Sequence, residues 1–256
     1  GEACILDLTT LTITPGTAVV FENATVSDVS VVALSSTKAI VCYQDQGNSS
    51  YGTACILDVS GSTITPGTPA VFETSSSAYI AVEAISSTKA IVCYQDVGNS
   101  QYGTACILDI SGSTITPGTP HVFQSAASTY VDVTVLSATQ AVVSYIATSG
   151  YPYAIVLDIT GSSLANSGGT ALALLSGSIG TKCVVVSSTK ILIYFNGGSN
   201  SAYAKVVMVV DISGSSITTN GRGISLTEPE SDNASRTPCD LIQIDSETYA
   251  IDKRET

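Results

Sequence analysis

Short apolar segments of strand length alternate with turn residues along the whole chain, and no segment has the periodicity of a helix. Four kinds of extended segment occur, exemplified by AYIAVEAIS, KAIVCYQD, GTACILDVS and TITPGTPAVFE. The second and third contain continuous apolar runs, as expected for strands covered on both faces. The fourth carries Pro66 and Pro69, which are tolerated mainly on an edge strand. The pattern predicts four-stranded sheets with a buried middle and a proline-bearing edge.

This four-segment pattern recurs with a period of about 51 residues. SSTKAIVCYQD occurs at 35–45 and again at 86–96, and YGTACILD occurs at 51–58 and 102–109. The short link DxGNSxYG between them is rich in Gly, Asn and Ser, which predicts a hairpin and therefore antiparallel strands. That argues against a parallel β-helix. Five aspartates after the third segment mark the phase: Asp7, Asp58, Asp109, Asp158 and Asp211.

Repeats of this length and strand content are typical of propeller blades. We therefore expect one all-β domain over residues 1–256, folded as a five-bladed β-propeller of four-stranded repeats. The chain begins on a third segment, GEACILDL, and ends after a first and part of a second, so N- and C-terminal strands are expected to share one blade and close the ring. The last segment has Asp252, Lys253 and Arg254 where other copies have Val, Cys and Tyr. The closing strand is thus expected to be short or distorted, or to face a partner.

Composition excludes several classes of partner. The net charge is −12 with only nine Lys plus Arg, so no basic cluster is available to neutralise phosphates, and a nucleic-acid partner is not expected. The longest apolar stretches, such as KVVMVVDI at 205–212, fall short of the roughly 18 residues that a membrane helix needs, so no membrane insertion is expected. Since the chain lacks an initiator Met and begins in mid-repeat, we interpret it as a processed or excised piece.

The seven cysteines raise the question of disulfides or metal. Cys42 and Cys55 lie symmetrically about a hairpin, as do Cys93 and Cys106, so cross-strand disulfides are one hypothesis. The other hypothesis, favoured by what other copies place there, is free buried thiols that act as small hydrophobes. Those residues are Ser144, Ile155, Ile193 and Met208. With one histidine and no CxxC spacing, a metal site has little support and no cofactor is expected.

Candidate catalytic residues are few. His121 stands alone beside Pro120 and is expected at the surface, which leaves no serine-hydrolase triad. The recurrent aspartates precede Ser-Gly or Thr-Gly, where a carboxylate can accept turn N–H bonds, so a structural role is favoured. A catalytic carboxylate pair should be singular, and these are not. We expect no enzyme, with a glycosidase as a distant alternative.

The pattern SSTKAIVxYxDxGNSxYGTAxIL followed by SGSTITPGTPxVF resembles the repetitive β-propeller segments of tail-fibre and other adhesive structural proteins of bacteriophages, and of related bacterial surface proteins. The resemblance covers residues 1–150 and, more weakly, 151–256. DxGNSxY is also similar to the Asp-box of sialidase propellers, although the aromatic residue comes one position late and is Tyr. The resemblance implies non-enzymatic attachment to a cell-surface glycan or surface protein. It further implies virion or filament subunits as partners, and a virion, extracellular or cell-surface location.

In a propeller, the loops joining second to third strands share a face with those joining fourth to first strands. Tyr, Asn and Asp there would offer a flat apolar surface plus donors and acceptors, which suits a sugar ring. The candidates are Asp45, Asn48, Tyr51, Asp96, Asn99, Tyr102, Tyr153, Asn196, Asn200 and Tyr203, with Tyr151 nearby and Tyr79 and Tyr130 from adjoining loops. Ordinary hairpins require the same residue types, so plain turns remain an alternative. A purely structural or assembly module is the second functional hypothesis.

Overall fold

The structure is a computed structural model that describes residues 1–7, 12–168, 172–173, 178–197, 204–226, 241–243 and 249–251. In these ranges every regular element is a β-strand except one short 3-10 turn, η1 (Gln46–Asn48). The described residues contain no helix of the length and apolar character needed to cross a membrane. The expectation of an all-β fold is confirmed.

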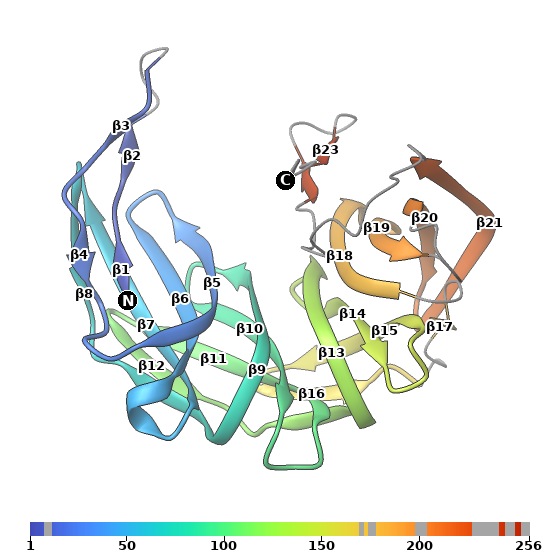
Figure 1. Cartoon of the computed structure of the whole chain (residues 1–256), viewed down its shortest axis with the longest axis horizontal. Coiled ribbons are helices and arrows are strands. Elements are labelled where there is room, and N and C mark those ends of the chain that lie inside the picture. The colour runs from blue at the N-terminus through green and yellow to red at the C-terminus, as the bar shows by residue number, and fades with distance from the viewer. Residues whose placement is uncertain are drawn as a thin grey trace.

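The strands form four successive units, which we name A to D (Figure 1). Each unit has four strand positions, and in units A to C the outermost position is filled by two consecutive segments that both pair with the third strand. Unit A contains β5 (Val26–Ser35), β6 (Lys38–Asp45), β7 (Tyr51–Ser60), β8 (Thr63–Pro66) and the first half of β9 (Ala70–Ser86). Unit B contains the second half of β9, then β10 (Lys89–Asp96), β11 (Tyr102–Ser111), β12 (Thr114–Pro117) and the first half of β13 (His121–Ser137).

The other two units follow the same plan. Unit C contains the second half of β13, β14 (Gln140–Ala147), β15 (Pro152–Thr160), β16 (Ser163–Asn166) and β17 (Leu172–Ala173). Unit D contains β18 (Ser178–Ser187), β19 (Lys190–Gly197), β20 (Ala204–Ser213) and β21 (Ser216–Leu226). All these strands pair antiparallel with their neighbours, as the hairpin links predict.

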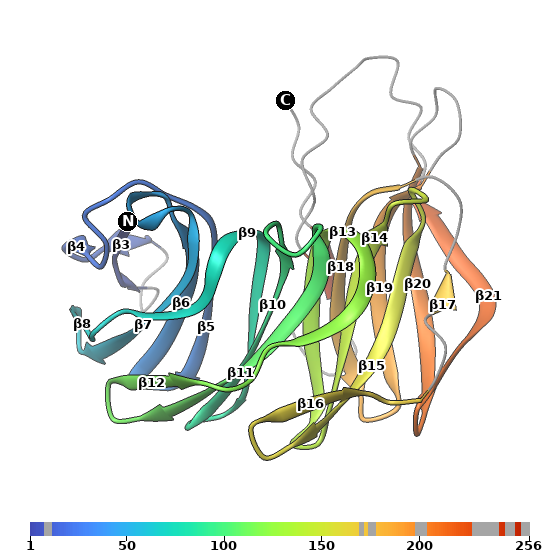
Figure 2. The same ribbon diagram turned by 90° about the horizontal axis from the view of Figure 1, so that it is seen from below.

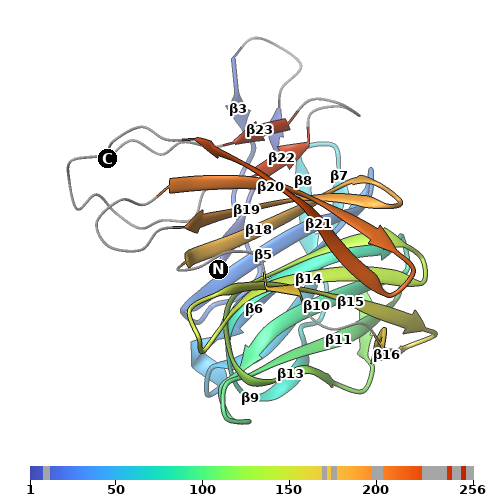
Figure 3. The ribbon, with the colours of Figure 1, turned by 90° about the vertical axis from the view of Figure 1, so that its right-hand side faces the viewer.

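The units are arranged along an arc, with unit A at one end and unit D at the other (Figure 1). Strands β9 and β13, each 17 residues long, run from the outer edge of one unit into the first position of the next (Figure 2). Consecutive first strands therefore lie next to one another in the series β5, β9, β13, β18. We call these four strands the inner row. Viewed from the unit D side, β18, β19 and β20 lie side by side (Figure 3).

The core lies between the units, and units B and C bury both sheet faces against their neighbours. One apolar cluster joins Ile40 and Ile56 of unit A to Val92 and Leu108 of unit B. The opposite face of unit B packs on unit C in the same way, and unit C packs on unit D. This explains the continuous apolar runs of the second and third strands, because a sheet with one solvent-exposed face needs apolar residues only at alternate positions.

The two chain ends form partial sheets. The N-terminal strands are β1 (Glu2–Ala3), β2 (Leu6–Asp7), β3 (Thr14–Pro15) and β4 (Val19–Val20), and the C-terminal ones are β22 (Leu241–Gln243) and β23 (Tyr249–Ile251). β1 pairs with β4, β2 with β3, and β22 with β23. No strand pair among the described residues joins the two ends, so the described strands form an open arc and not the expected closed five-bladed ring. β23 stops at Ile251, directly before the charged residues 252–254, which lie outside the described residues.

The strand register decides the disulfide question. Val41 pairs with Cys55 and Cys42 pairs with Ala54, so the two cysteines are one residue out of register and point to opposite faces of the sheet. The six cysteines in the described ranges are free, and all of them except Cys4 are buried. The favoured hypothesis of free buried thiols is confirmed for the five buried cysteines, whereas Cys4 is free and exposed. The register also places Tyr194, and not Ile193, at the position of Cys42, because Lys190–Asp211 aligns with Lys38–Asp58.

Candidate binding face

The hairpins between second and third strands are shaped by the aspartates that precede them. Asp45 caps η1, and its Oδ1 accepts the N–H of Gly47 at 2.9 Å. Asp96 Oδ1 accepts the N–H of Asn99 at 3.0 Å and the hydroxyl of Ser75 at 2.6 Å. Each aspartate is only 8% exposed. These two candidate residues therefore hold the loops in shape, as the turn interpretation expects.

The tips of the same loops carry the exposed candidates. Asn48 and Asn99 are exposed, while Tyr51 and Tyr102 begin the third strands and are half-buried. The two residues before each tyrosine adopt left-handed backbone conformations, with φ of 55° and 62° in one copy and 55° and 64° in the other. The structure thus presents the same rigid asparagine–tyrosine pair twice on one face, in units A and B.

Units C and D reproduce this arrangement only in part. Tyr153 is half-buried in β15 and stacks on Tyr145, with ring centroids 5.8 Å apart, and Tyr151 beside it is exposed. Asn196 lies in β19, where its Cα pairs with those of Ile179 and Lys205. Asn200 and Tyr203 lie outside the described residues. For the whole set, a binding role stays a prediction.

Tyr79 and Tyr130 are not in loops, contrary to expectation. They lie within β9 and β13, in the inner row, at the same end of the sheets as the hairpins. Their rings contact each other, with centroids 5.0 Å apart, although they belong to different units. A β-bulge at this point keeps each tyrosine within its first strand, and the predicted segment AYIAVEAIS already contains Tyr79. The recurrence of tyrosine at positions 79 and 130, one full period apart, was the sequence signal that these two residues occupy equivalent places.

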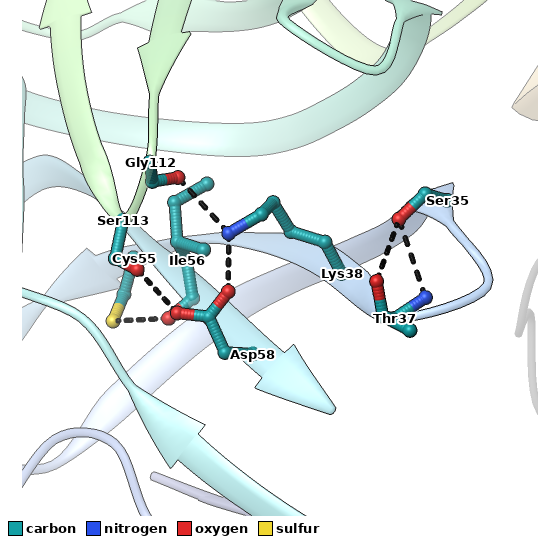
Figure 4. Close-up of polar contacts among 8 residues, drawn as sticks. All are labelled: Ser35, Thr37, Lys38, Cys55, Ile56, Asp58, Gly112 and Ser113. Carbon is teal, nitrogen blue, oxygen red and sulfur yellow. Dashed lines mark hydrogen bonds and ion pairs between the residues drawn. The ribbon is translucent and has the colours of Figure 1, made fainter. Parts of the chain in front are cut away.

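The opposite face carries a contact between units that involves the recurrent aspartates (Figure 4). Asp58 accepts hydrogen bonds from Lys38 of its own unit and from the Ser113 hydroxyl of unit B. Lys38 also donates to the Gly112 carbonyl oxygen at 2.9 Å. Hydrogen bonds from Lys38, then from Ser113, hold the pKa of Asp58 below its usual value. The expected structural role is found, although the donors are a lysine and a neighbouring serine, and not turn N–H groups.

This contact repeats along the arc. Asp109 accepts from Lys89 and from Ser162 of unit C, and Lys190 pairs with Asp211 in unit D. Burial raises the pKa of Asp109, but the hydrogen bonds from Lys89 and Ser162 outweigh it and leave that pKa lowered. We call the Asp58–Lys38–Ser113 set and its copies the interunit latch.

The last candidates from the sequence are His121 and a possible metal site. His121 Nε2 lies 2.9 Å from Asn166 Oδ1, a pairing at the surface of unit C's edge. Within the described ranges, no three His, Cys, Asp or Glu side chains gather closely enough to hold a metal ion.

Comparison with solved structures finds a similar fold. The SapL1 lectin, solved in complex with alpha methyl fucoside, gives a TM-score of 0.53 at 13% identity, covering 88% of this chain and 71% of the lectin. A mutant of AofleA from Arthrobotrys oligospora gives a TM-score of 0.46 at 11% identity, covering 77% of this chain and 58% of that one. No family model and no curated protein matches the sequence. The likeness to SapL1 is one of fold, and these comparisons lend no support to the resemblance to phage adhesive proteins.

Proposed function

We propose that the chain is a non-enzymatic carbohydrate-binding module that attaches to cell-surface glycans. The observation that carries the proposal is the twofold repetition of an exposed asparagine beside a half-buried tyrosine, Asn48 with Tyr51 and Asn99 with Tyr102, on one face. The likeness in fold to a lectin adds support. In this proposal the module acts at a virion, extracellular or cell surface, since that is where such glycans are met.

The chemistry of these loops suits saccharides. An asparagine amide supplies both donors and an acceptor, and a tyrosine ring supplies a flat apolar face with a hydroxyl at its edge. The buried caps at Asp45 and Asp96 fix the loops, so little ordering is required on binding. Equivalent weak sites on adjacent units would act together, and avidity could exceed single-site affinity by roughly 10² to 10⁴. The recurrent carboxylates are engaged in the interunit latch, which favours binding over catalysis.

Attachment to immobilised glycans tests this proposal. We expect the wild-type chain to bind a glycan array and to be displaced only by high concentrations of monovalent sugar. Tyr51→Ala/Tyr102→Ala should lower retention at least about ten-fold while the melting temperature stays unchanged. Ser36→Ala/Ser87→Ala, on the opposite face, is the matched control. A wild-type chain that binds no glycan would overturn the proposal and favour the purely structural or assembly module.

We propose in addition that the arc closes into a five-bladed propeller. The N-terminal strands have the register of a third and fourth strand: Leu6 pairs with Pro15 as Leu57 pairs with Pro66, and Glu2 pairs with Val20 as Thr53 pairs with Val71. The C-terminal hairpin has the register of a first and second strand, since Leu241–Ile251 matches Val31–Val41 and Gln243–Tyr249 matches Ala33–Ala39. The two ends together contain the four strands of one further unit.

The face of unit A that is turned away from unit B indicates which strands would have to cover it in a closed ring. The N-terminal strands cover its outer part, where Phe21 packs with Val41 and Leu57. Its inner part, Val29 and Val31, is exposed. In unit B the corresponding residues are covered by the first and second strands of unit A. The matching occupant for unit A is therefore the C-terminal hairpin, which contributes first and second strands, and which already contacts β18 at the other end of the arc.

Thiol accessibility tests closure. Cys4 is exposed in the open arc, whereas its counterparts Cys55 and Cys106 are buried against a preceding unit. In the closed ring Cys4 would face unit D, so we expect it to react with a thiol reagent as slowly as Cys55, with peptide mapping to assign the labelled site. Fast labelling of Cys4 in the native chain would show that the arc stays open.

A further inference from the structure

The inner row contains a repeated backbone distortion on the same face as the hairpins. Each first strand bulges at one position, where Asp28, Tyr79 and Tyr130 have φ of 48°, 52° and 50°, and Gly180 has φ of 81°. Glycine adopts this left-handed conformation freely, but a bulky side chain rarely does. Three units therefore retain an unfavourable conformation where the fourth has the residue best suited to it. Such conformations are enforced by the surrounding structure and cluster at ligand-binding and other functional sites.

A cavity of about 250 Å³ lies at this row of bulges. It is lined by Asp28, Tyr79, Tyr130, Thr181 and Lys182, together with aliphatic residues of the same strands. All four units contribute to it, one through each first strand. Because the position is Asp, Tyr, Tyr and Gly in successive units, the side-chain set occurs once per chain and is not repeated like the hairpins.

Polar groups around the cavity are held in place. The Thr181 hydroxyl donates to the Tyr130 carbonyl oxygen at 2.7 Å. Lys182 Nζ lies 3.2 Å from Asp132 Oδ1, while Asp132 Oδ2 accepts the N–H of Cys183 at 2.7 Å. Burial, then the nearby Tyr130 and Asp28, raises the pKa of Tyr79, so its phenol stays a neutral hydrogen-bond donor. The wall is thus organised before any ligand arrives.

These groups define a ligand chemistry. Two tyrosine rings tilted by 45° offer apolar faces, and the carboxyl of Asp28, which also accepts a hydrogen bond from the Tyr79 backbone, can accept a hydroxyl hydrogen bond at the rim. The cavity is smaller than the roughly 300–1,000 Å³ typical of drug-sized ligands, which fits a single ring and not an extended chain. A neutral pyranose matches this combination of one apolar face and a polar rim.

We propose that this cavity is a single saccharide site that takes one terminal pyranose ring of a glycan, separate from the hairpin sites. The choice of ligand class rests on the proposed carbohydrate-binding function. In this arrangement Tyr79 and Tyr130 stack on the ring, and Asp28 accepts a hydrogen bond from one of its hydroxyl groups. One terminal ring would bind at the inner row while the hairpins of units A and B contact neighbouring sugars of the same surface.

The test uses a substitution that introduces the residue found at the equivalent position of another unit. Tyr79→Gly/Tyr130→Gly places in units B and C the residue that unit D has at Gly180, so the backbone conformation is retained without strain and the fold should persist. Asp28→Asn, a residue that also tolerates positive φ, removes the charge and keeps the shape. Ser36→Ala/Ser87→Ala, on the opposite face of units A and B, is the matched control. Each variant is first checked by its melting temperature against the wild-type chain.

Saturation-transfer NMR and calorimetry with a panel of methyl pyranosides, including methyl α-fucoside, measure binding. We expect one dominant sugar site per wild-type chain, a loss of its affinity of at least about ten-fold in Tyr79→Gly/Tyr130→Gly, a smaller loss in Asp28→Asn, and no loss in Ser36→Ala/Ser87→Ala. Unchanged affinity in Tyr79→Gly/Tyr130→Gly, or a loss confined to Tyr51→Ala/Tyr102→Ala, would overturn the single site while leaving glycan attachment intact. If the wild-type chain binds neither these sugars nor a glycan array, the proposed function fails and this site fails with it.

Discussion

Units A and B each have a sheet face that points toward the N-terminal end of the arc. These two faces have nearly the same sequence, but one is exposed and the other is buried. Val31 is 62% exposed and its counterpart Val82 is 6% exposed; Val29 is 51% exposed and its counterpart Ile80 is 7% exposed. The difference arises from the neighbour and not from the residues, because unit A covers unit B while nothing described covers the inner part of unit A. A repeat that stacks face to face carries on each copy an apolar surface that requires a following or preceding copy. The end of the arc is therefore where the fold has unfinished packing.

The largest expected effect comes from placing a charge on the two faces. Val82→Asp buries a carboxylate between units A and B without a partner, and should lower the free energy of unfolding by more than about 3 kcal/mol. In the closed ring that we propose, Val31→Asp should cost a comparable amount. Urea denaturation measures both. If Val31→Asp changes stability by less than about 0.5 kcal/mol while Val82→Asp unfolds the chain, the end of unit A is solvated and the arc is open.

The interior of the arc also holds a carboxylate that its end lacks, since Val32 occupies in unit A the position of Glu83 in unit B. Burial, then repulsion from Asp132, raises the pKa of Glu83 from its ordinary 4.5 to about 7, against a lowering hydrogen bond with the Ala84 backbone. The folded protein thus keeps a proton that the unfolded chain has lost, so stability should fall as pH rises from about 4.5 to 7.

Glu83→Gln removes this titration. We expect the variant to be more stable than the wild type at pH 8, by on the order of 1–2 kcal/mol once partial solvation is allowed for, and to have a flatter dependence on pH. That corresponds to a rise in melting temperature of a few degrees. Melting temperatures of both proteins, measured at half-unit pH intervals, test the expected stability difference and its pH dependence. A wild-type chain whose stability is constant between pH 5 and 7 would contradict the raised pKa.

The fold could be inferred from the sequence where a pattern is local, and not where distant segments must meet. The apolar runs and the period predicted the four-segment pattern that recurs in units A to D. The bulges at Tyr79 and Tyr130 were missed because the signal that ends a strand, a polar or small residue, does not distinguish a loop from an extended strand with one inserted residue. Ring closure depends on pairing β23 with residues near the N-terminus, which no local pattern encodes.

At the candidate binding site, the residue types in the sequence indicated which face of the molecule carries the loops. They did not indicate which residues of those loops are buried caps and which are exposed. Asp45 and Asn48 look alike as loop residues, yet one is a buried cap and the other is exposed, a difference set by which group can reach the Gly47 N–H. The alternative in which Cys42 faces Cys55 was wrong by one residue of register, because counting residues on either side of a turn does not fix which residues pair.

A smaller effect is expected at the interunit latch, which joins A to B and B to C. Ser113→Ala and Ser162→Ala each remove one hydrogen bond to a partly exposed aspartate, and should cost about 0.5–1 kcal/mol. Because the pKa values of Asp58 and Asp109 are lowered, their contribution is complete above about pH 4 and is lost as pH falls further, through the folded pKa. Acid titration of Asp58→Asn should show a shallower loss. An acid transition identical to that of the wild type would argue against the latch.

The smallest expected effect is that of reduction, where we predict no change at all. Cys42 lies in the cluster between units A and B, whereas Cys55 lies in the cluster beneath the N-terminal strands, so the sheet itself separates the two sulfur atoms. Burial raises the pKa of Cys42 and, to about 11, that of Cys106, which keeps both as unreactive thiols. The melting temperature should be the same within about 1 °C with and without dithiothreitol, since a lost disulfide would cost 2–5 kcal/mol. A drop of several degrees on reduction would mean that the strands pair in a different register, with Cys42 opposite Cys55, and would remove the basis for comparing the two ends of the arc.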